Sequence, residues 1–240
     1  MTKFSAAGRD MGFVHLGGNP PIEIILRRSA LARRISLRVS RTDGRVTLSM
    51  PNWTAESEAM DFAREKEGWI RQNLAQQQAF QKVHTGGCVL LEGQEIHIVP
   101  ADGRSVRFDG SQLQVPGSQE RSGSRVAAFM KVIARQRLSA ASDHYAALVG
   151  EQYRGITIRD TRSRWGSCTT DGNLMYSWRL IMAPPAVLDY VAAHEVAHLV
   201  EMNHSDAYWR IVDRIYPGYK APRKWLRTNG ARLHSFQFQN

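Results

Sequence analysis

Cysteine is scarce in this sequence, and long hydrophobic runs are missing. The 240 residues include two cysteines, Cys88 and Cys168, and neither belongs to a CxxC motif or a Cys/His cluster. Two cysteines are too few for a disulfide framework, so a hydrophobic core must hold the fold together. Every apolar run is interrupted by Arg, Asp or Gly within about ten residues, whereas a membrane-spanning helix needs about 20 apolar residues. These absences predict a protein of the reducing cytoplasm that does not enter the membrane.

The N-terminal residues also lack the apolar segment and small-residue cleavage site of a signal peptide, so we expect no secretion by that route. Residues 1–21 contain several glycines and show no hydrophobic periodicity. Such a composition is typical of a segment without regular structure. We therefore expect a flexible arm over residues 1–21.

Acidic residues are outnumbered, with 22 Asp and Glu against 32 Lys and Arg, which gives a net charge of +10. The excess lies in two flanks, residues 22–50 and residues 205–240, each with seven basic and two acidic residues. Basic flanks of this kind could contact a polyanion or an acidic substrate. The alternative is that the arginines face water on half-buried strands, because no nucleic-acid-binding motif accompanies them.

Alternating apolar residues predict a β-rich module over residues 22–116. Asp43-Gly44 supplies the turn of a β-hairpin between two of its strands. A helix is expected from Thr54 or Ser57 to about Gln78, because apolar residues recur there at helical spacing. We expect an antiparallel module with this one helix. Its strands are predicted at residues 22–26, 35–39, 46–48, 88–91, 95–99, 105–108 and 112–115.

Residues 116–124 are rich in Gly, Ser and Gln, a composition typical of a linker. We place the domain boundary there and expect a second domain over residues 124–235. Apolar periodicity predicts a long helix over 124–149, and Pro184-Pro185 predicts the start of another, because proline suits the first helical turn. A shorter helix is expected over 206–215. Strands are predicted at residues 156–159, 164–168 and 174–181.

The helix that follows Pro185 contains the sequence His-Glu-Val-Ala-His. His194 and His198 are four residues apart, so their imidazoles project from one face of the helix and can bind one metal ion. Glu195 lies beside that face, where it could hold a metal-bound water and take its proton. His204 follows six residues later, an interval at which the chain can bring back a third ligand through a tight turn. We expect Asn203, which tolerates the left-handed backbone conformation, to form that turn.

Three imidazoles with a fourth position open to water are typical of a catalytic zinc site rather than a structural one. The ligand set has no soft thiolate and no planar arrangement, so we favour Zn²⁺ over copper or nickel. One alternative is that Glu201 or a distant carboxylate, rather than His204, is the third ligand. A separate question is whether Glu201 orients a ligand histidine or simply faces solvent. A further alternative is that the histidines merely satisfy the core of the helix.

These motifs resemble the YgjP-like metallopeptidase domain family. The resemblance covers residues 22–230 and implies an α+β fold class, in which the antiparallel β-rich N-terminal module precedes a zincin-like α+β metallohydrolase domain. It also implies zinc ligation by His194, His198 and His204, with Glu195 as general base. The motifs that carry it are RWGSC at 164–168, SWRLI at 177–181, Pro184, DYVAAHEVAHL at 189–199 and NHSDAYW at 203–209.

Three further side chains are candidates for stabilising a developing oxyanion: Arg164, Arg179 and Tyr208. Each could instead make a salt bridge or a core hydrogen bond. An extended peptide could pair with the strand at 164–168 or at 174–181. Four tryptophans are expected to pack within the protein rather than to stack on a substrate, namely Trp165, Trp178, Trp209 and Trp225.

The leading hypothesis is a zinc-dependent metallopeptidase that acts on peptides or proteins. One alternative is a metal-dependent hydrolase of a phosphoanhydride such as a nucleotide, because the basic flanks could bind phosphate. Another is a nucleic-acid-associated adaptor with a vestigial metal site. The pattern of residues does not determine the oligomeric state.

Overall fold

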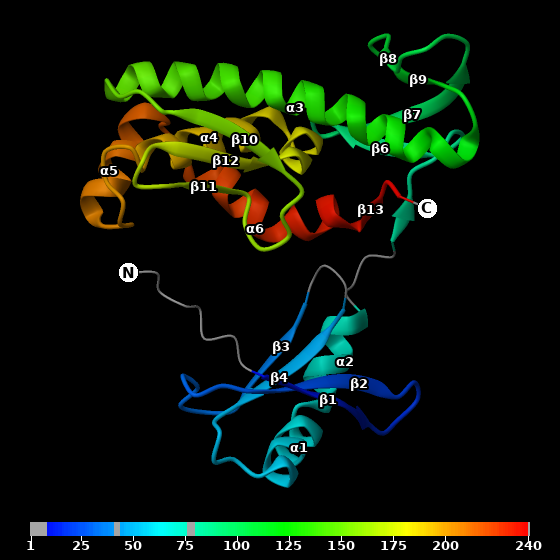
Figure 1. Cartoon of the computed structure of the whole chain (residues 1–240), viewed down its shortest axis with the longest axis vertical. Coiled ribbons are helices and arrows are strands. Elements are labelled where there is room, and N and C mark those ends of the chain that lie inside the picture. Colours follow the sequence, from blue (N-terminus) through cyan, green and yellow to red (C-terminus); the bar gives the residue numbers. More distant parts are fainter. Residues whose placement is uncertain (1–8, 41–43, 76–79, 240) are drawn as a thin grey trace. The chain divides into compact units, whose positions relative to one another are not determined.

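The computed structural model describes residues 9–40, 44–75 and 80–239 and divides the chain into two compact units (Figure 1). The first unit is Met1–Ala79 and the second is Phe80–Asn240. Each has a hydrophobic core of its own. Of the helices in the described ranges, none combines the length and apolar character that crossing a membrane requires.

The first unit is a four-stranded sheet with two helices. Its strand order is β1-β2-β4-β3. Ala59, Ala63 and Ile70 of the helices belong to the same core as the buried side chains of the sheet. The elements are β1 (Arg9–Leu16), β2 (Ile22–Arg28), β3 (Ser36–Val39), β4 (Val46–Met50), α1 (Glu56–Glu65) and α2 (Glu67–Ala75).

Three sequence-based expectations for this unit are corrected by the structure. Residues 9–16 of the predicted arm form β1, which pairs with β2 along its length. A register shift between Asp10 and Gly12 interrupts the periodicity there. The sheet is mixed rather than antiparallel. Strand β4 lies between β2 and β3, and it is parallel to β2 and antiparallel to β3. The single predicted helix is two helices, α1 and α2, on either side of Lys66. Residues 1–8 of the predicted arm lie outside the described residues.

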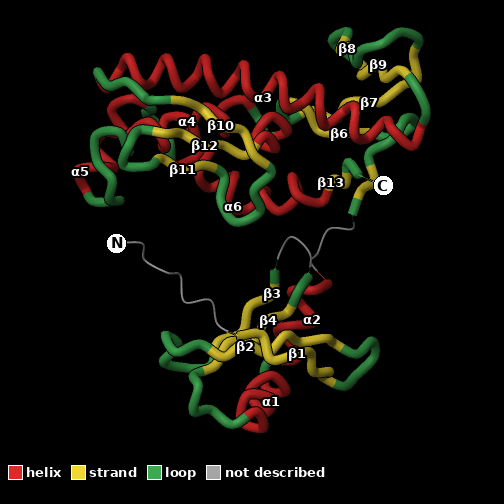
Figure 2. Tube along the Cα trace, viewed as in Figure 1, coloured by secondary structure: helices red, strands yellow, loops and turns green. Residues whose placement is uncertain are grey.

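The second unit carries the nine remaining strands of the described residues, in three small sheets, together with most of the helices (Figure 2). One sheet has the order β6-β7-β9-β8, and another has the order β10-β12-β11, with β11 at an edge. Helix α3 contacts β9, β10 and α4. The elements are β5 (Gln81–Lys82), β6 (Cys88–Leu91), β7 (Gln94–Ala101), β8 (Arg107–Phe108), β9 (Gln112–Pro116), α3 (Gln119–Val149), β10 (Gly155–Arg159), β11 (Gly166–Cys168), β12 (Asn173–Ser177), the 3-10 helix η1 (Trp178–Met182), α4 (Pro185–Ala197), α5 (Asp206–Ile215), α6 (Lys220–Ser235) and β13 (Phe236–Gln237).

The predicted strand over 174–181 ends early, at Ser177. Residues 178–182 form η1 and are all buried. Because a strand directs successive side chains to opposite faces, five consecutive buried residues suit a helical turn inside the core better. Helix α6 had no counterpart among the expected elements, since basic residues dilute its apolar pattern.

The division between the units differs from the predicted domain boundary. Strands β6, β7 and β9 share one hydrophobic core with α3, through residues such as Ile98, Leu113 and Met130. The predicted linker contains the start of α3 instead. Within it, a Cβ atom at Gly123 would lie 2.6 Å from the carbonyl oxygen of Val83 and 2.8 Å from that of Phe238. At Gly123, a residue that made this segment resemble a linker, glycine is needed because other parts of the backbone pack closely against the helix.

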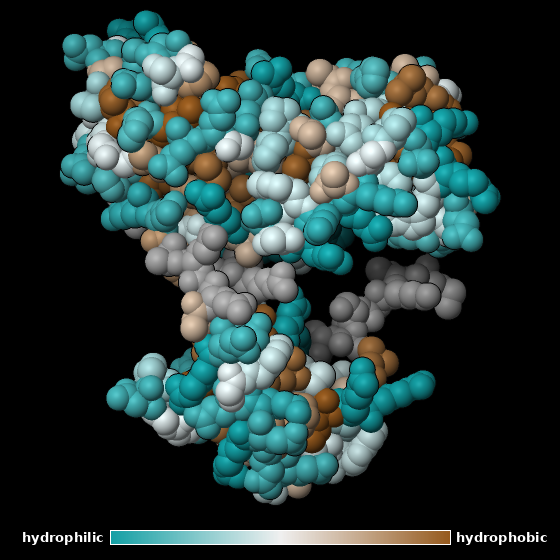
Figure 3. Space-filling model, turned by 180° about the vertical axis from the view of Figure 1, so that it is seen from behind, coloured by the Kyte–Doolittle hydropathy of each residue, from teal (hydrophilic) through white to brown (hydrophobic). Residues whose placement is uncertain are grey.

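Hydrophilic residues cover much of the face shown in Figure 3, with apolar residues scattered among them. Such a surface is typical of a folded chain in water, where apolar side chains are never wholly excluded from the surface.

Candidate metal centre

Helix α4 carries the first part of the site through the core of the second unit. Pro185 stands in its first turn, where the missing N–H costs no hydrogen bond. Ala192, Ala193, Val196 and Ala197 are fully buried, so the helix is enclosed by its neighbours instead of exposing one polar face. Its last turn therefore places side chains in a fixed, largely dry environment.

The structure brings together the three histidines expected as metal ligands. One nitrogen from each of His194, His198 and His204 lies within 4.8 Å of the others. The Nε2 atoms of His194 and His204 are 3.2 Å apart. Two nitrogens bound to one tetrahedral zinc ion at about 2.0–2.1 Å would be roughly 3.3–3.4 Å apart, so this pair fits a shared ion. The donor set could hold Zn²⁺.

The turn after α4 returns His204 to the site without the expected left-handed residue. Among the described residues other than glycine, a positive φ occurs at Glu92, so Asn203 does not adopt this conformation. Instead, the Glu201 carboxylate accepts a hydrogen bond from the Asn203 N–H, at 3.2 Å. Ser205 then caps α5 by accepting a hydrogen bond from the Tyr208 N–H. Hydrogen bonds on both sides of His204 therefore hold the turn.

Hydrogen bonds orient the ring of His198 and hold the backbone of His194. The Nδ1 atom of His198 lies 3.0 Å from the Glu201 carbonyl oxygen, to which it can donate, leaving Nε2 available for a metal. The Tyr208 hydroxyl donates to the His194 carbonyl oxygen at 2.9 Å. The Tyr208 ring also stacks on that of His198, with centroids 4.5 Å apart. Tyr208 therefore supports the histidines, which is the core hydrogen-bond alternative considered for it.

Burial favours the neutral form, which a metal requires, at His194 and His198. The pKa of His194 is lowered to about 3, chiefly by desolvation and in addition by the charges of His198, His204 and Arg223. Burial also lowers the pKa of His198. Because a neutral imidazole has a lone pair to donate, these histidines can take up a cation at neutral pH without first losing a proton.

Glu195 is buried beside these residues and packs against β11. It is 5% exposed, and burial raises its pKa to about 8, while the positive charge of Arg164 opposes the shift. A Cβ atom at Gly166 would lie 2.5 Å from the Glu195 Oε1 atom. Only glycine at this position therefore leaves room for the carboxyl group. The sequence analysis missed this contact, although a glycine within a predicted strand indicates close approach of another group.

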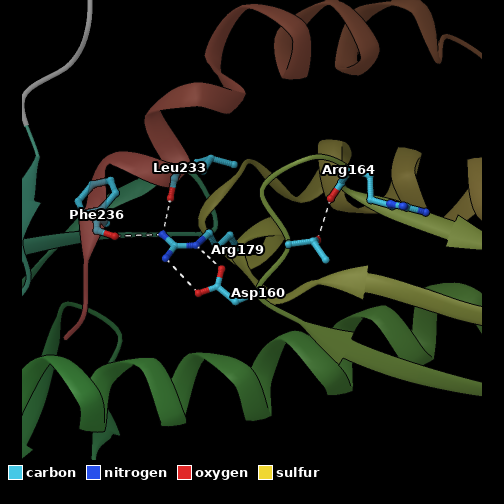
Figure 4. A network of polar contacts seen from close by, with 6 residues as sticks. Asp160, Arg164, Arg179, Leu233 and Phe236 are labelled. Carbon is cyan, nitrogen blue, oxygen red and sulfur yellow. Dashed lines mark hydrogen bonds and ion pairs between the residues drawn. The ribbon is translucent and has the colours of Figure 1, made fainter. Parts of the chain in front are cut away.

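The side chain of Arg179, a candidate for stabilising an oxyanion, makes an ion pair and two hydrogen bonds to the backbone. Its Nε and Nη2 atoms donate to the Asp160 carboxylate at 2.6 and 3.2 Å. Its Nη1 atom donates to the carbonyl oxygens of Leu233 and Phe236 (Figure 4). The arginine thus joins the end of α6 to the loop after β10, which is the salt-bridge alternative considered for it.

Arg164 is exposed and lies apart from that network. Its side chain points away from Arg179 in Figure 4, and its carbonyl oxygen accepts a hydrogen bond from the Thr161 hydroxyl. The positive charge of Arg164 opposes the raising effect of burial on the pKa of Glu195. Within the described residues, the guanidinium group of Arg164 makes no hydrogen bond. The side chains of the other two candidates, Arg179 and Tyr208, both donate hydrogen bonds within the protein.

An aromatic and basic cluster borders the histidines on another side. The Trp209 ring centroid is 5.8 Å from that of His204 and 6.0 Å from that of His194. The guanidinium carbon of Arg223, on α6, lies 4.4 Å from the Trp209 ring centroid. Sequence reasoning assigned Arg223 to the basic flank alone, because the contact depends on how α6 packs against α5.

Comparison with known proteins identifies one family and one similar structure of interest. The model of the YgjP-like metallopeptidase domain matches residues 33–229. Among solved structures, the crystal structure of the metallopeptidase zymogen of Pyrococcus abyssi abylysin is similar, with 21% sequence identity and a TM-score of 0.36. That alignment covers 38% of this chain and 93% of that chain. No curated protein matches the sequence.

Proposed function

Because the chain belongs to the YgjP-like metallopeptidase domain family, we propose that it is a zinc-dependent peptidase that hydrolyses peptide bonds in peptides or proteins. The observation that carries the proposal is the convergence of nitrogens from His194, His198 and His204 at one point. Zn²⁺ suits this donor set, because imidazoles are among its preferred ligands and a fourth position stays open.

The chain would supply the remaining groups of the reaction. A zinc ion held by the three histidines would polarise the substrate carbonyl and make water more acidic. Glu195 would accept the proton of the attacking water and deliver it to the leaving amine. Because burial raises the pKa of this carboxyl group, its carboxylate form binds a proton more strongly than that of an exposed glutamate. An extended substrate would pair with β11, since that strand lies at a sheet edge beside α4.

Metal content and peptide cleavage test the two parts of the proposal separately. Elemental analysis of the purified protein should find about one zinc per chain, which His194→Ala and His204→Ala lose. His144→Ala, which changes an exposed histidine on α3, serves as the control and should keep its zinc. Glu195→Gln should keep zinc but cleave peptides about 10²–10⁴-fold more slowly.

Two results would reject the peptidase. One is a chain that takes up no zinc even when zinc is added. The other is a zinc-loaded chain that leaves peptides intact but releases phosphate or pyrophosphate from nucleotides. The second result would instead support the phosphoanhydride hydrolase considered in the sequence analysis.

A further inference from the structure

We propose that Arg223, held over Trp209, forms a subsite that binds a carboxylate group of the peptide substrate beside the metal centre. The inference rests on the proposed peptidase function and names the chemistry of its substrate. It concerns a pair of residues to which the sequence analysis assigned only surface charge and packing.

The position of the pair comes from three elements that meet at the histidines. Trp209, on α5, is in ring contact with both His194 and His204. Tyr219, which precedes α6, stacks on Trp209 with centroids 5.2 Å apart and an interplanar angle of 16°. Arg223 is one helical turn after Tyr219 and lies over the same indole. Trp209 therefore connects the arginine to the candidate metal centre.

The Arg223 guanidinium has donors to offer. Within the described residues, no hydrogen bond or ion pair engages its nitrogens, and the residue is exposed. Stacking on an indole uses the face of the guanidinium and leaves the N–H groups at its edge available. Arg179 differs in this respect, because its nitrogens already donate hydrogen bonds to Asp160 and to two backbone carbonyls.

The acidic side chains close to Trp209 lie beside other basic side chains. The surface depression of about 310 Å³ beside Trp209 is lined by two acidic and two basic side chains, so its charges balance. Within the described residues, Arg223 makes no ion pair, and its contact is with the Trp209 ring. The charged side chains that line the depression are Asp206, Arg210, Asp213 and Lys220.

A carboxylate is the substrate group that this geometry favours. The planar fork of arginine matches the two oxygens of a carboxylate, and a charge-assisted pair of this kind is stronger than a neutral hydrogen bond. In a peptide the carboxylate can come from the C-terminus or from an Asp or Glu side chain near the scissile bond. Both sources present the same chemistry to Arg223, and the experiment below separates them.

The test compares three fluorogenic peptides on the zinc-loaded full chain at low salt. The first has Glu near the cleaved bond and an amidated C-terminus. The second has Gln in place of Glu, also amidated, and the third has Gln with a free C-terminal carboxylate. We expect kcat/KM to be about tenfold higher for the first or third peptide than for the second, since tenfold corresponds to one modest charged contact. Whichever peptide gains identifies the source of the carboxylate.

Variants then assign the preference to Arg223. Arg223→Gln should bring the ratio between acidic and neutral peptides close to one, chiefly through KM, whereas Arg223→Lys should keep part of the preference. Lys224→Gln removes an adjacent exposed charge of the same helix and should leave the ratio as in the wild type. Cleavage without any preference, or a preference that Arg223→Gln leaves intact, overturns the subsite.

A binding measurement separates failure of the subsite from failure of the proposed function. Fluorescence anisotropy of the same peptides, labelled and added to zinc-loaded Glu195→Gln, does not need turnover. If the wild type cleaves no peptide but the acidic peptides bind more tightly through Arg223, the peptidase proposal fails and the subsite stands. Equal binding of all three peptides, with and without Arg223→Gln, contradicts the subsite whatever the outcome for cleavage.

Discussion

Gly166 is the residue whose replacement should damage the site most directly. In Gly166→Ala the new methyl group would lie within 2.5 Å of the Glu195 carboxyl oxygen, so the side chain must move. A displacement of about 1 Å at a catalytic group can cost about 10²-fold in rate, so we expect peptide cleavage to fall by that factor or more. Zinc content, measured by elemental analysis, should stay near the wild-type level because the ligands are elsewhere.

The control for this variant is Gly155→Ala, at the start of β10. A Cβ atom there would meet no heavy atom within 4 Å, and its φ is not in the left-handed region. It should cleave peptides at nearly the wild-type rate. If Gly166→Ala were equally active, Glu195 would not need the position in which the structure shows it.

Tyr208→Phe decides between two roles for the tyrosine. The hydroxyl donates to the His194 carbonyl oxygen, and the ring stacks on His198, so phenylalanine keeps the stacking and loses one hydrogen bond. We expect the free energy of unfolding, measured in urea, to fall by about 1–2 kcal/mol, because the carbonyl loses its buried partner. Cleavage should fall less than tenfold. A donor to a transition-state oxyanion would cost about 10²–10³-fold instead, and that result would restore the catalytic assignment.

At the scale of elements, the N-terminal part of α3 depends on a glycine in its interior. Alanine usually stabilises a helix relative to glycine by about 1 kcal/mol. At Gly123 the sign should reverse, because the methyl group would lie 2.6 Å from the Val83 carbonyl oxygen and 2.8 Å from that of Phe238. We expect Gly123→Ala to lower the free energy of unfolding by about 1–3 kcal/mol, the usual cost of overpacking.

Ser124→Ala is the neighbouring control for that variant. Its side chain is exposed and, among the described residues, donates a hydrogen bond only to the carbonyl oxygen of Arg121 in the same helix. Stability in a urea titration should therefore change little. A stabilised Gly123→Ala would mean that the segments around Val83 and Phe238 can move away from α3 at little cost.

At the scale of the whole molecule, His234 makes stability depend on pH. Its ring is buried and stacks on Trp165. Burial lowers its pKa to about 4, the charges of Arg179 and Arg162 lower it too, and Asp160 opposes them. In the unfolded chain His234 therefore binds a proton as the pH falls below about 6.5, whereas in the folded chain it binds one only near pH 4. Stability should fall as the pH decreases between these values.

Removing the histidine isolates this contribution from those of the other buried histidines. Between pH 7.5 and pH 5, the wild type should lose about 1–2 kcal/mol more free energy of unfolding than His234→Gln loses. Urea titrations followed by circular dichroism at the two pH values measure the difference. Equal losses in the two proteins would show that His234 is protonated in the folded state.

Because the chain divides into two compact units, we expect the second unit to fold on its own. Phe80–Asn240 contains the whole of its hydrophobic core and all three histidines. A fragment of residues 80–240 should unfold cooperatively and bind about one zinc, as calorimetry and elemental analysis can show. A fragment without a cooperative transition would indicate that the first unit, Met1–Ala79, is needed for the fold.

The sequence by itself determined the features that depend on neighbours along the chain. The family was identified correctly from short motifs, and the spacing of His194, Glu195 and His198 predicts one helical turn because helical geometry is periodic. Strands such as β6 and the hairpin of β3 and β4 were also predicted, since alternation and turn residues are local signals. The roles proposed for the three histidines and Glu195 stay predictions until metal and activity are measured.

The tertiary structure alone decided which distant residues meet. The contact of Gly166 with Glu195, the position of Arg223 over Trp209 and the use of Arg179 as a brace each join elements far apart in the sequence. The boundary between the two units, which lies before Phe80 and not at the predicted linker, also depends on contacts between segments far apart in the sequence. Such contacts arise when side chains pack to fill a common core, and no periodicity along one segment records what another segment brings to it.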